Sequence, residues 1–231
     1  MKSLSIAGSD TDVGKTILTT SLVAYWQKYQ KNKSLGLMKL MQTGSGDREL
    51  YNRLFSGDRS VEIVTPLSFP EPLAPPIAAL KAGENIDLGK VWQAFQGLLE
   101  RQDFTILETI GGLGSPVTNE LTVADLVAQW RLNLVLVVPI KLGAISQAVA
   151  NVALARQSGI DLKGIVLSSV QPLSGEEMLD LAPQELIQSL TQIPVLGTIP
   201  YLEDCSDLDK LADAASNLDL EYILPMKSIT I

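Results

Sequence analysis

Short apolar runs alternate with amphipathic stretches along most of the chain. Apolar runs typical of buried strands occupy residues 4–7, 35–39, 104–107 and 134–138. Stretches with helical character occupy residues 14–31, 48–55, 88–101, 123–130, 145–158 and 208–217, and the alternation continues through 164–168, 183–190 and 195–199. Nearly continuous apolar strands separated by helices predict an α/β fold, in which a mostly parallel sheet carries helices on both faces.

Residues 66–76 interrupt this alternation. The segment contains Pro66, Pro70, Pro72, Pro75 and Pro76. Proline cannot donate a backbone hydrogen bond, so the segment is predicted to be neither a central strand nor a helix but an ordered loop. The composition does not change across it, which favours a single domain over residues 1–231. A linker between two domains is the alternative.

The composition is that of a folded protein with an acidic surface. Of the 231 residues, 46% are hydrophobic and 19% charged, and the net charge is −8. Such a charge repels phosphate backbones and anionic lipids, so neither nucleic acid nor a membrane is expected as a partner. The apolar run 134–140 is too short to span a bilayer, and the first residues lack the apolar stretch of a signal peptide. The expected location is the cytoplasm.

Two residue counts restrict the chemistry. The chain has no histidine and a single cysteine, Cys205. Ser-His-Asp and Cys-His catalysis, zinc sites built on imidazole and an intramolecular disulfide are therefore excluded. Lysines, carboxylates, hydroxyls, backbone amides and hard metal ions remain. Phosphoryl transfer suits these groups, because it depends on positioning and cationic stabilisation more than on a titrating base.

The segment after the first predicted strand carries a phosphate-binding pattern. It reads Gly-Ser-Asp-Thr-Asp-Val-Gly-Lys-Thr over residues 8–16 and opens a predicted helix. Backbone N–H groups at such a helix start converge on phosphate oxygens. Lys15 is predicted to reach the outer phosphates and the Thr16 hydroxyl to bind Mg²⁺. Ser9 stands where the strict pattern has its first glycine, and an ordinary turn with a solvent-facing lysine is the alternative. With this loop, the prediction becomes a P-loop NTPase-like fold.

Three further charged residues follow predicted strands. Lys39 ends the second strand, Asp47 comes shortly after it, and Glu108 follows the strand at 104–107. Ligands of open α/β sheets bind at the carboxyl ends of the strands, so Lys39 is predicted to lie near Lys15 and to face the same anion. Thr16, Asp47 and Glu108 would supply hard oxygen ligands for Mg²⁺. Taken singly, each charged residue could instead be a solvated residue at a strand end.

The combination of these motifs resembles the dethiobiotin synthetase family. The phosphate loop matches the family pattern Gly-Thr-Asp-Thr-x-Val-Gly-Lys-Thr. Lys39-Leu40-Met41-Gln42-Thr43-Gly44 is similar to the second signature, Lys-Pro-x-x-Ser/Thr-Gly, and Glu108-Thr109-Ile110-Gly111-Gly112 to the segment Glu-Gly-Ala-Gly-Gly. The segments 69–75, 137–143 and 197–202 also have counterparts in the family. The resemblance covers about residues 3–202.

The resemblance implies a reaction and a set of site residues. ATP, CO₂ and 7,8-diaminononanoate would give dethiobiotin, ADP and phosphate, with Mg²⁺ and the co-substrate ATP bound by a homodimer. Lys15 and Lys39 would be catalytic, Thr11, Thr43 and Gly111 would contact the substrate, and Thr16, Asp47 and Glu108 would hold the metal. The implied nucleotide-binding residues are Asp12, Val13, Gly14, Lys15, Thr16, Ile17, Asp47, Glu108, Gly111, Ser168, Pro200, Tyr201 and Leu202.

The chain departs from the family pattern at several positions. Leu40 replaces a proline, Thr109-Ile110 replaces a Gly-Ala pair, and Ser168 stands where the family has an asparagine that contacts the base. A serine hydroxyl cannot reproduce the paired donor and acceptor of an amide, so the preferred base is left open. A family histidine after the proline-rich segment is Pro76 here.

Two other functions are compatible with a P-loop. One is an amide-forming synthetase of the cobyrinate diamide type, although those enzymes usually carry an additional glutaminase-like domain with a catalytic cysteine. The other is a nucleotide-dependent switch or regulatory module, including ParA-like ATPases. The ParA group typically has a second lysine early in the phosphate loop, where this chain has Gly8-Ser9-Asp10.

Overall fold

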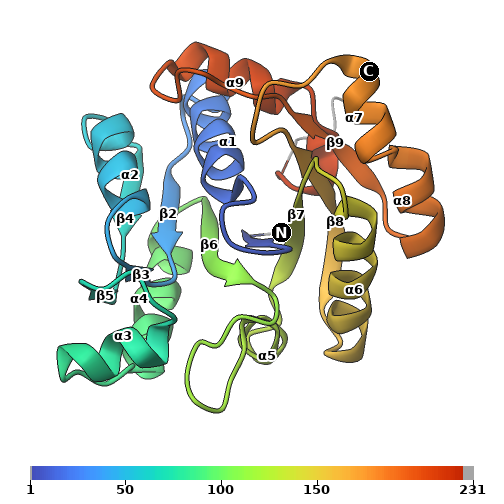
Figure 1. Cartoon of the computed structure of the whole chain (residues 1–231). Helices are drawn as coiled ribbons and strands as arrows, with labels where there is room; N and C mark the ends of the chain where they lie inside the picture. The colour runs from blue at the N-terminus through green and yellow to red at the C-terminus, as the bar shows by residue number, and fades with distance from the viewer. Residues whose placement is uncertain (1, 226–231) are drawn as a thin grey trace.

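A seven-stranded parallel sheet forms the centre of the computed structural model, which describes residues 2–225 (Figure 1). The strand order is β4-β2-β6-β1-β7-β8-β9, and every pairing within it is parallel. The strands are β1 (Ser3–Gly8), β2 (Leu35–Lys39), β4 (Val61–Val64), β6 (Phe104–Gly112), β7 (Asn133–Pro139), β8 (Asp161–Ser168) and β9 (Val195–Ile199). Two short strands, β3 (Gln42–Thr43) and β5 (Ser68–Phe69), pair separately beside it.

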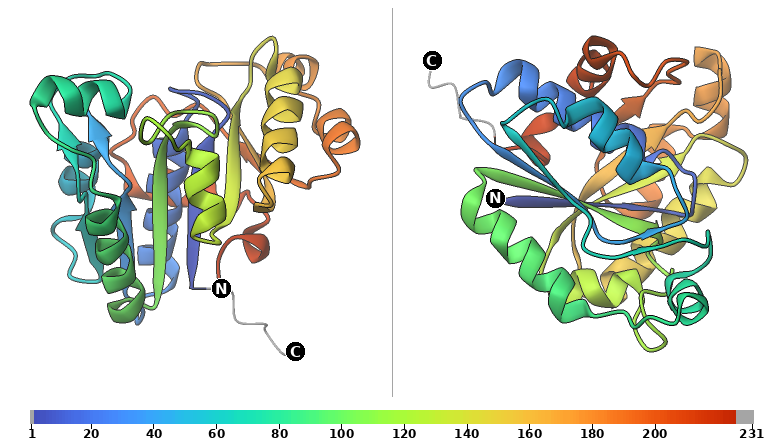
Figure 2. Two further views of the ribbon diagram at one scale, coloured as in Figure 1. Left: turned by 90° about the horizontal axis from the view of Figure 1, so that it is seen from below. Right: turned by 90° about the vertical axis from the view of Figure 1, so that its left-hand side faces the viewer.

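Helices cover both faces of the sheet, as the right-hand view of Figure 2 shows. One face carries α1 (Lys15–Tyr29), α2 (Asp47–Phe55) and α9 (Leu208–Ser216). The other core contains side chains from α3 (Pro75–Ala82), α4 (Leu88–Arg101), α5 (Val123–Gln129), α6 (Ala144–Gln157) and α8 (Gln184–Thr191). A helix α7 (Gly175–Leu181) and a 3₁₀ turn (Leu220–Tyr222) complete the described elements. Within residues 2–225, no helix has the length and apolarity needed to cross a membrane.

The alternation of side chains along the central strands explains the two layers. In β7, Leu134, Leu136 and Val138 point into the core with α4, α5 and α6, whereas Val135 and Val137 point into the core with α1 and α2. All five side chains are fully buried. Because both faces are covered, the strand consists almost entirely of apolar residues. The predicted fold class is therefore confirmed.

The strand order brings distant segments to one edge of the sheet. β6 lies between β2 and β1, so Lys39 at the end of β2 is the register partner of Glu108. On the other side of β6, Ile6 of β1 is also a partner of Glu108. The loop after β1 and the segment after β2 consequently start beside the same carboxylate.

The proline-rich segment is more structured than its composition predicted. The prediction of a loop over residues 66–76 is wrong at two places, because β5 pairs with β3 and α3 begins at Pro75. Proline is well suited to the first turn of a helix, where its missing N–H has no intrahelical acceptor. β6 also differs from the prediction: it continues to Gly112, so Glu108 lies within the strand and not after it.

Candidate functional site

The loop between β1 and α1 contains two residues in left-handed backbone conformations. Asp12 and Gly14 have positive φ angles of 55° and 95°. Gly14 also passes close to β8, since a Cβ on it would lie 2.1 Å from Ser168 Oγ. Both the positive φ and this close approach require glycine at position 14. The carbonyl of Gly14 accepts from Leu18 N at 3.0 Å, so α1 starts directly at the loop.

A cavity of about 390 Å³ opens in front of this loop. It is lined by ten of the residues that the sequence singled out: Thr11, Asp12, Val13, Gly14, Lys15, Thr16, Lys39, Thr43, Asp47 and Gly111. Met41, Gln42, Ser45, Pro72 and Ile110 complete the wall. Lys39 and Lys15 therefore line the same cavity, and their binding of one anion stays a prediction.

Asp47 and Glu108 both contact the hydroxyl of Thr16 at the cavity. Thr16 Oγ1 is 2.8 Å from Asp47 Oδ1 and 3.1 Å from Glu108 Oε1. These groups come from the first turns of α1 and α2 and from β6. Hydroxyl and carboxylate oxygens are the ligands that Mg²⁺ prefers alongside phosphate oxygens and water. The set fits a magnesium ion that is completed by a nucleotide.

Lys39 forms an ion pair with each of the two carboxylates. Its Nζ is 2.7 Å from Glu108 Oε1 and also hydrogen bonds to Asp47 Oδ2. Burial by itself would lower the Lys39 pKa, but the charges of Glu108 and Asp47 outweigh it and raise the pKa. Likewise, burial would raise the pKa of Asp47, and Lys39 reverses the direction and lowers it. Lysine and aspartate therefore stabilise each other's charged forms.

Lys15 is compensated less directly than Lys39, because its ammonium contacts a backbone carbonyl and Lys39 contacts two carboxylates. Its side chain is buried and its Nζ donates to the carbonyl of Asp10 at 3.1 Å. Burial lowers its pKa, and the nearby charge of Lys39 acts in the same direction, against the opposing effects of Glu108 and Asp47. An anion bound in the cavity would satisfy this ammonium better than a backbone carbonyl does.

The sequence analysis did not identify Tyr51, which belongs to the same cluster. It is fully buried on α2, and its hydroxyl donates to Glu108 Oε2. Burial, together with the charge of Glu108, raises the Tyr51 pKa well above its ordinary value, so the hydroxyl keeps its proton. A buried tyrosine in an amphipathic helix looks like any other core aromatic in a sequence, and its partner on β6 is distant along the chain.

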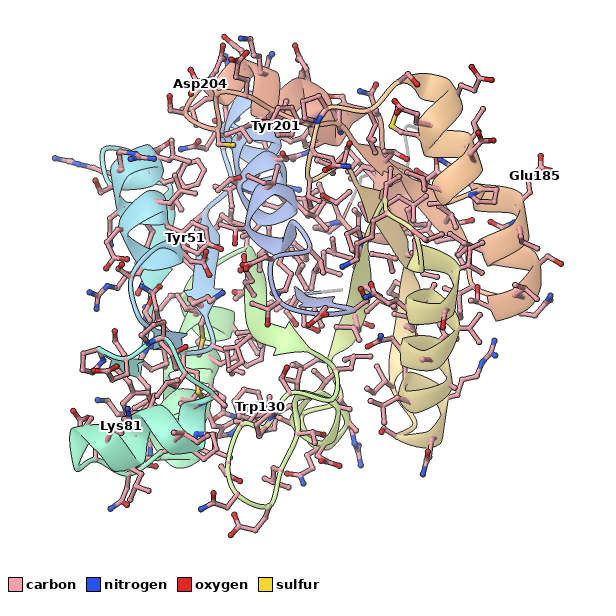
Figure 3. All side chains as sticks on the ribbon, in the orientation of Figure 1. Tyr51, Lys81, Trp130, Glu185, Tyr201 and Asp204 are labelled. Atoms are coloured by element: carbon pink, nitrogen blue, oxygen red, sulfur yellow. The ribbon has the colours of Figure 1, made fainter. Side chains whose placement is uncertain are left out.

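The remaining predicted residues lie outside the cavity wall. Glu108 is fully buried and reaches the cavity through Thr16 and Lys39. Ile17 and Leu202 pack against the same small core cluster, and the buried Ser168 lies against Gly14. Pro200 and Tyr201 are exposed in the segment after β9 (Tyr201 is labelled in Figure 3).

Comparison with known proteins gives matches of two kinds. A family model described as an AAA domain matches residues 2–208. Solved structures include a ParA family ATPase from Chlorobium tepidum (TM-score 0.58, 13% identity, 96% of this chain and 95% of that one). The MinC:MinD cell division protein complex of Aquifex aeolicus is similar over 98% of this chain and 99% of its own (TM-score 0.58, 15% identity). At these identities the likeness concerns the fold, a P-loop ATPase fold.

Sequence relatives are much closer. A protein of Gloeothece citriformis named ATP-dependent dethiobiotin synthetase is 62% identical over 98% of this chain and 100% of its own length. Proteins of the same name from Crocosphaera subtropica and Synechocystis are 55% and 51% identical, covering 96% of this chain and 100% and 94% of their own lengths. The chain belongs to the ATP-dependent dethiobiotin synthetase family.

Proposed function

We propose that this protein closes the cyclic urea of dethiobiotin on 7,8-diaminononanoate, using CO₂ and ATP, as a ligase of biotin synthesis. The observation that carries the proposal is the cluster of Lys39, Asp47, Glu108 and Thr16 at the end of the phosphate loop. The full-length relatives named dethiobiotin synthetase support the choice of reaction. In this proposal, the enzyme is a single domain over residues 1–231.

ATP would bind with its phosphates against the loop. Residues at the start of α1 line the cavity, where their amides would bind phosphate, and the Lys15 ammonium, which contacts the Asp10 carbonyl, would reach the outer phosphate oxygens. Thr16, Asp47 and Glu108 would hold Mg²⁺. When bound, the metal would supply positive charge to the phosphate oxygens that gain negative charge during transfer. The segment Pro200–Leu202, with Ser168 and Ile17, would lie towards the base.

Lys39 would assist the transfer itself. One amine of the substrate captures CO₂ as a carbamate, the carbamate oxygen attacks the γ-phosphorus, and ADP leaves. The second amine then attacks the carbamoyl carbon, closes the ring and expels phosphate. Carbamate and ATP are both anionic, so their approach needs a cation between them. Lys39 lines the cavity and keeps its charge because its pKa is raised.

The rest of the cavity wall suits a diamine with an aliphatic chain. Thr11, Thr43 and Gly111 would contact the polar end of the substrate, and the apolar Met41 and Ile110 line the same space. A homodimer, with the substrate tail near the subunit interface, is part of the proposal. The proposal also includes a cytoplasmic location, and it expects neither nucleic acid nor a membrane as a partner.

The proposal is tested by measuring ADP release with Mg-ATP and bicarbonate, with and without 7,8-diaminononanoate. ADP release that depends on the diamine, together with dethiobiotin identified by mass spectrometry, is the expected result. Both should be lost in Lys39→Ala. ATP turnover that is indifferent to the diamine would contradict the proposal and favour a nucleotide-dependent switch.

A further inference from the structure

Tyr51 and Asp47 point from one helix into the same cluster of polar groups. They are four residues apart on α2 and therefore share a face of that helix. Asp47 contacts Thr16, and the Tyr51 hydroxyl donates to Glu108. Figure 3 shows Tyr51 on the side of α2 that faces β2.

The two oxygens of Glu108 have different partners. Oε1 lies 2.7 Å from Lys39 Nζ and 3.1 Å from Thr16 Oγ1, next to the cavity. Oε2 accepts from Tyr51. Since Glu108 is fully buried, no solvent competes for Oε2, and the tyrosine fixes which oxygen is presented to Thr16.

Tyr51 itself is held firmly. Its ring belongs to the core between α2 and the sheet, together with Phe55 on the same helix. The start of α2 is fixed by Glu49, whose carboxylate accepts from the amide of Gly46 at 2.8 Å and from Gln42 Nε2 at 2.8 Å. The hydroxyl therefore cannot follow Glu108 if the carboxylate rotates, so it limits that rotation.

We propose that Tyr51 is a positioning residue that restricts Glu108 to binding a metal through Oε1 alone, and thereby makes the site selective for Mg²⁺ over Ca²⁺. The inference rests on the proposed magnesium site. Mg²⁺ requires a near-ideal octahedron, and the two oxygens of one carboxylate lie too close together to fill two of its corners. Ca²⁺ is larger and readily takes both oxygens of a carboxylate. A hydroxyl bound to Oε2 keeps that oxygen from a second metal bond.

The test compares the affinity of ADP for the intact protein and for Tyr51→Phe by calorimetry, in Mg²⁺, in Ca²⁺ and in EDTA. Tyr51→Phe removes only the hydroxyl and keeps the ring in the core. Loss of a partner of this kind typically costs roughly 10- to 100-fold in metal affinity. The gain in ADP affinity due to Mg²⁺ should therefore fall roughly ten-fold or more, while the gain due to Ca²⁺ is kept or increased.

Two variants separate this effect from general packing. Phe55→Leu disturbs the same helix and core without touching a polar group, so it should leave the ratio of the Mg²⁺ and Ca²⁺ gains unchanged. In a Glu108→Gln background, Tyr51→Phe should cause little further change, because the tyrosine acts through Glu108.

If the ratio of the Mg²⁺ and Ca²⁺ gains in ADP affinity is unchanged in Tyr51→Phe, the inference is overturned. It is also overturned if Phe55→Leu changes this ratio as much as Tyr51→Phe does. Failure of the proposed site is recognised separately, in the unmodified protein. If Mg²⁺ there gives no gain in ADP affinity over EDTA, the metal site itself is wrong, whatever the variants do.

Discussion

Lys39 and Glu108 are direct partners in the register of β2 and β6, and their side chains meet with Nζ 2.7 Å from Oε1. Both residues are buried. The ion pair thus follows from the pairing of two central strands and does not depend on a flexible loop. Breaking this ion pair should therefore affect both the stability of the sheet and the arrangement of the site residues.

Removing the charge of Lys39 should destabilise the protein. Lys39→Met leaves Glu108 buried without its cation, and breaking a buried pair typically costs about 3–5 kcal/mol. Urea unfolding of the unligated protein measures this loss. Lys28→Met is the control: it breaks pairs with the exposed Asp209 and Asp213 and should change the free energy of unfolding much less. Equal effects of the two variants would contradict the structural role of Lys39.

The hydroxyl of Thr16 should be needed for metal-dependent nucleotide binding. Thr16→Ala removes the group that contacts Asp47 and Glu108, whereas Thr16→Ser keeps it. The Mg²⁺-dependent gain in ADP affinity should fall in Thr16→Ala by at least the roughly 10-fold typical of outer-shell partners, and should be largely kept in Thr16→Ser. Calorimetric titration with ADP checks this, and a similar loss in both variants would argue against hydroxyl ligation.

Glu49 should make α2 sensitive to acid. The amide of Gly46, followed by Gln42, lowers the Glu49 pKa from 4.5 to about 2. The unfolded chain therefore binds this proton more readily, and the stabilisation is present above about pH 4.5 and is lost as the pH falls through about 2. Urea unfolding across this range should show a shallower pH dependence in Glu49→Gln. Glu84→Gln, at an exposed loop position, should keep the dependence of the parent.

Gly14 should tolerate no side chain. In Gly14→Ala the new Cβ would meet Ser168 Oγ and the residue would keep a positive φ, so the cost should exceed about 1 kcal/mol and ADP binding should be lost. Gly159→Ala is the matched control, because Gly159 also has a positive φ, of 69°, but no atom within 4 Å of an added Cβ. It should lose stability through backbone strain alone and bind ADP normally. Unchanged ADP affinity in Gly14→Ala would contradict the close contact.

Much of the site was predictable because it depends on strand ends. The position of Lys39 at the end of an apolar run was enough to place it beside the phosphate loop, since parallel strands end at one edge, and Glu108, although inside β6, is its register partner. The hydroxyl of Thr16 followed from the loop pattern alone. The prediction erred over the length of β6, which continues beyond Glu108 to Gly112, where Gly112 pairs with Gly8 of β1.

What the sequence could not reveal depends on contacts between distant elements. Tyr51 differs from Phe55 by one hydroxyl, and only the packing of α2 against β6 shows that this hydroxyl has a charged partner. The helix α3 did carry a local signal, with two prolines at its start and Gly83 after its end. That signal was outweighed by the other prolines of the segment.

The position of β6 between β2 and β1 has a consequence for how the chain acquires its site during synthesis. The two strands that emerge first are not neighbours, and the strand that joins them lies beyond residue 103. A nascent chain that ends before β6 has its phosphate loop and Lys39, but it lacks both Glu108 and the strand that holds them together. The proposed nucleotide and metal site can therefore form only after about half of the chain, through Gly112, has been synthesised, and ligand binding by a nascent chain would report that β6 has paired with β1 and β2.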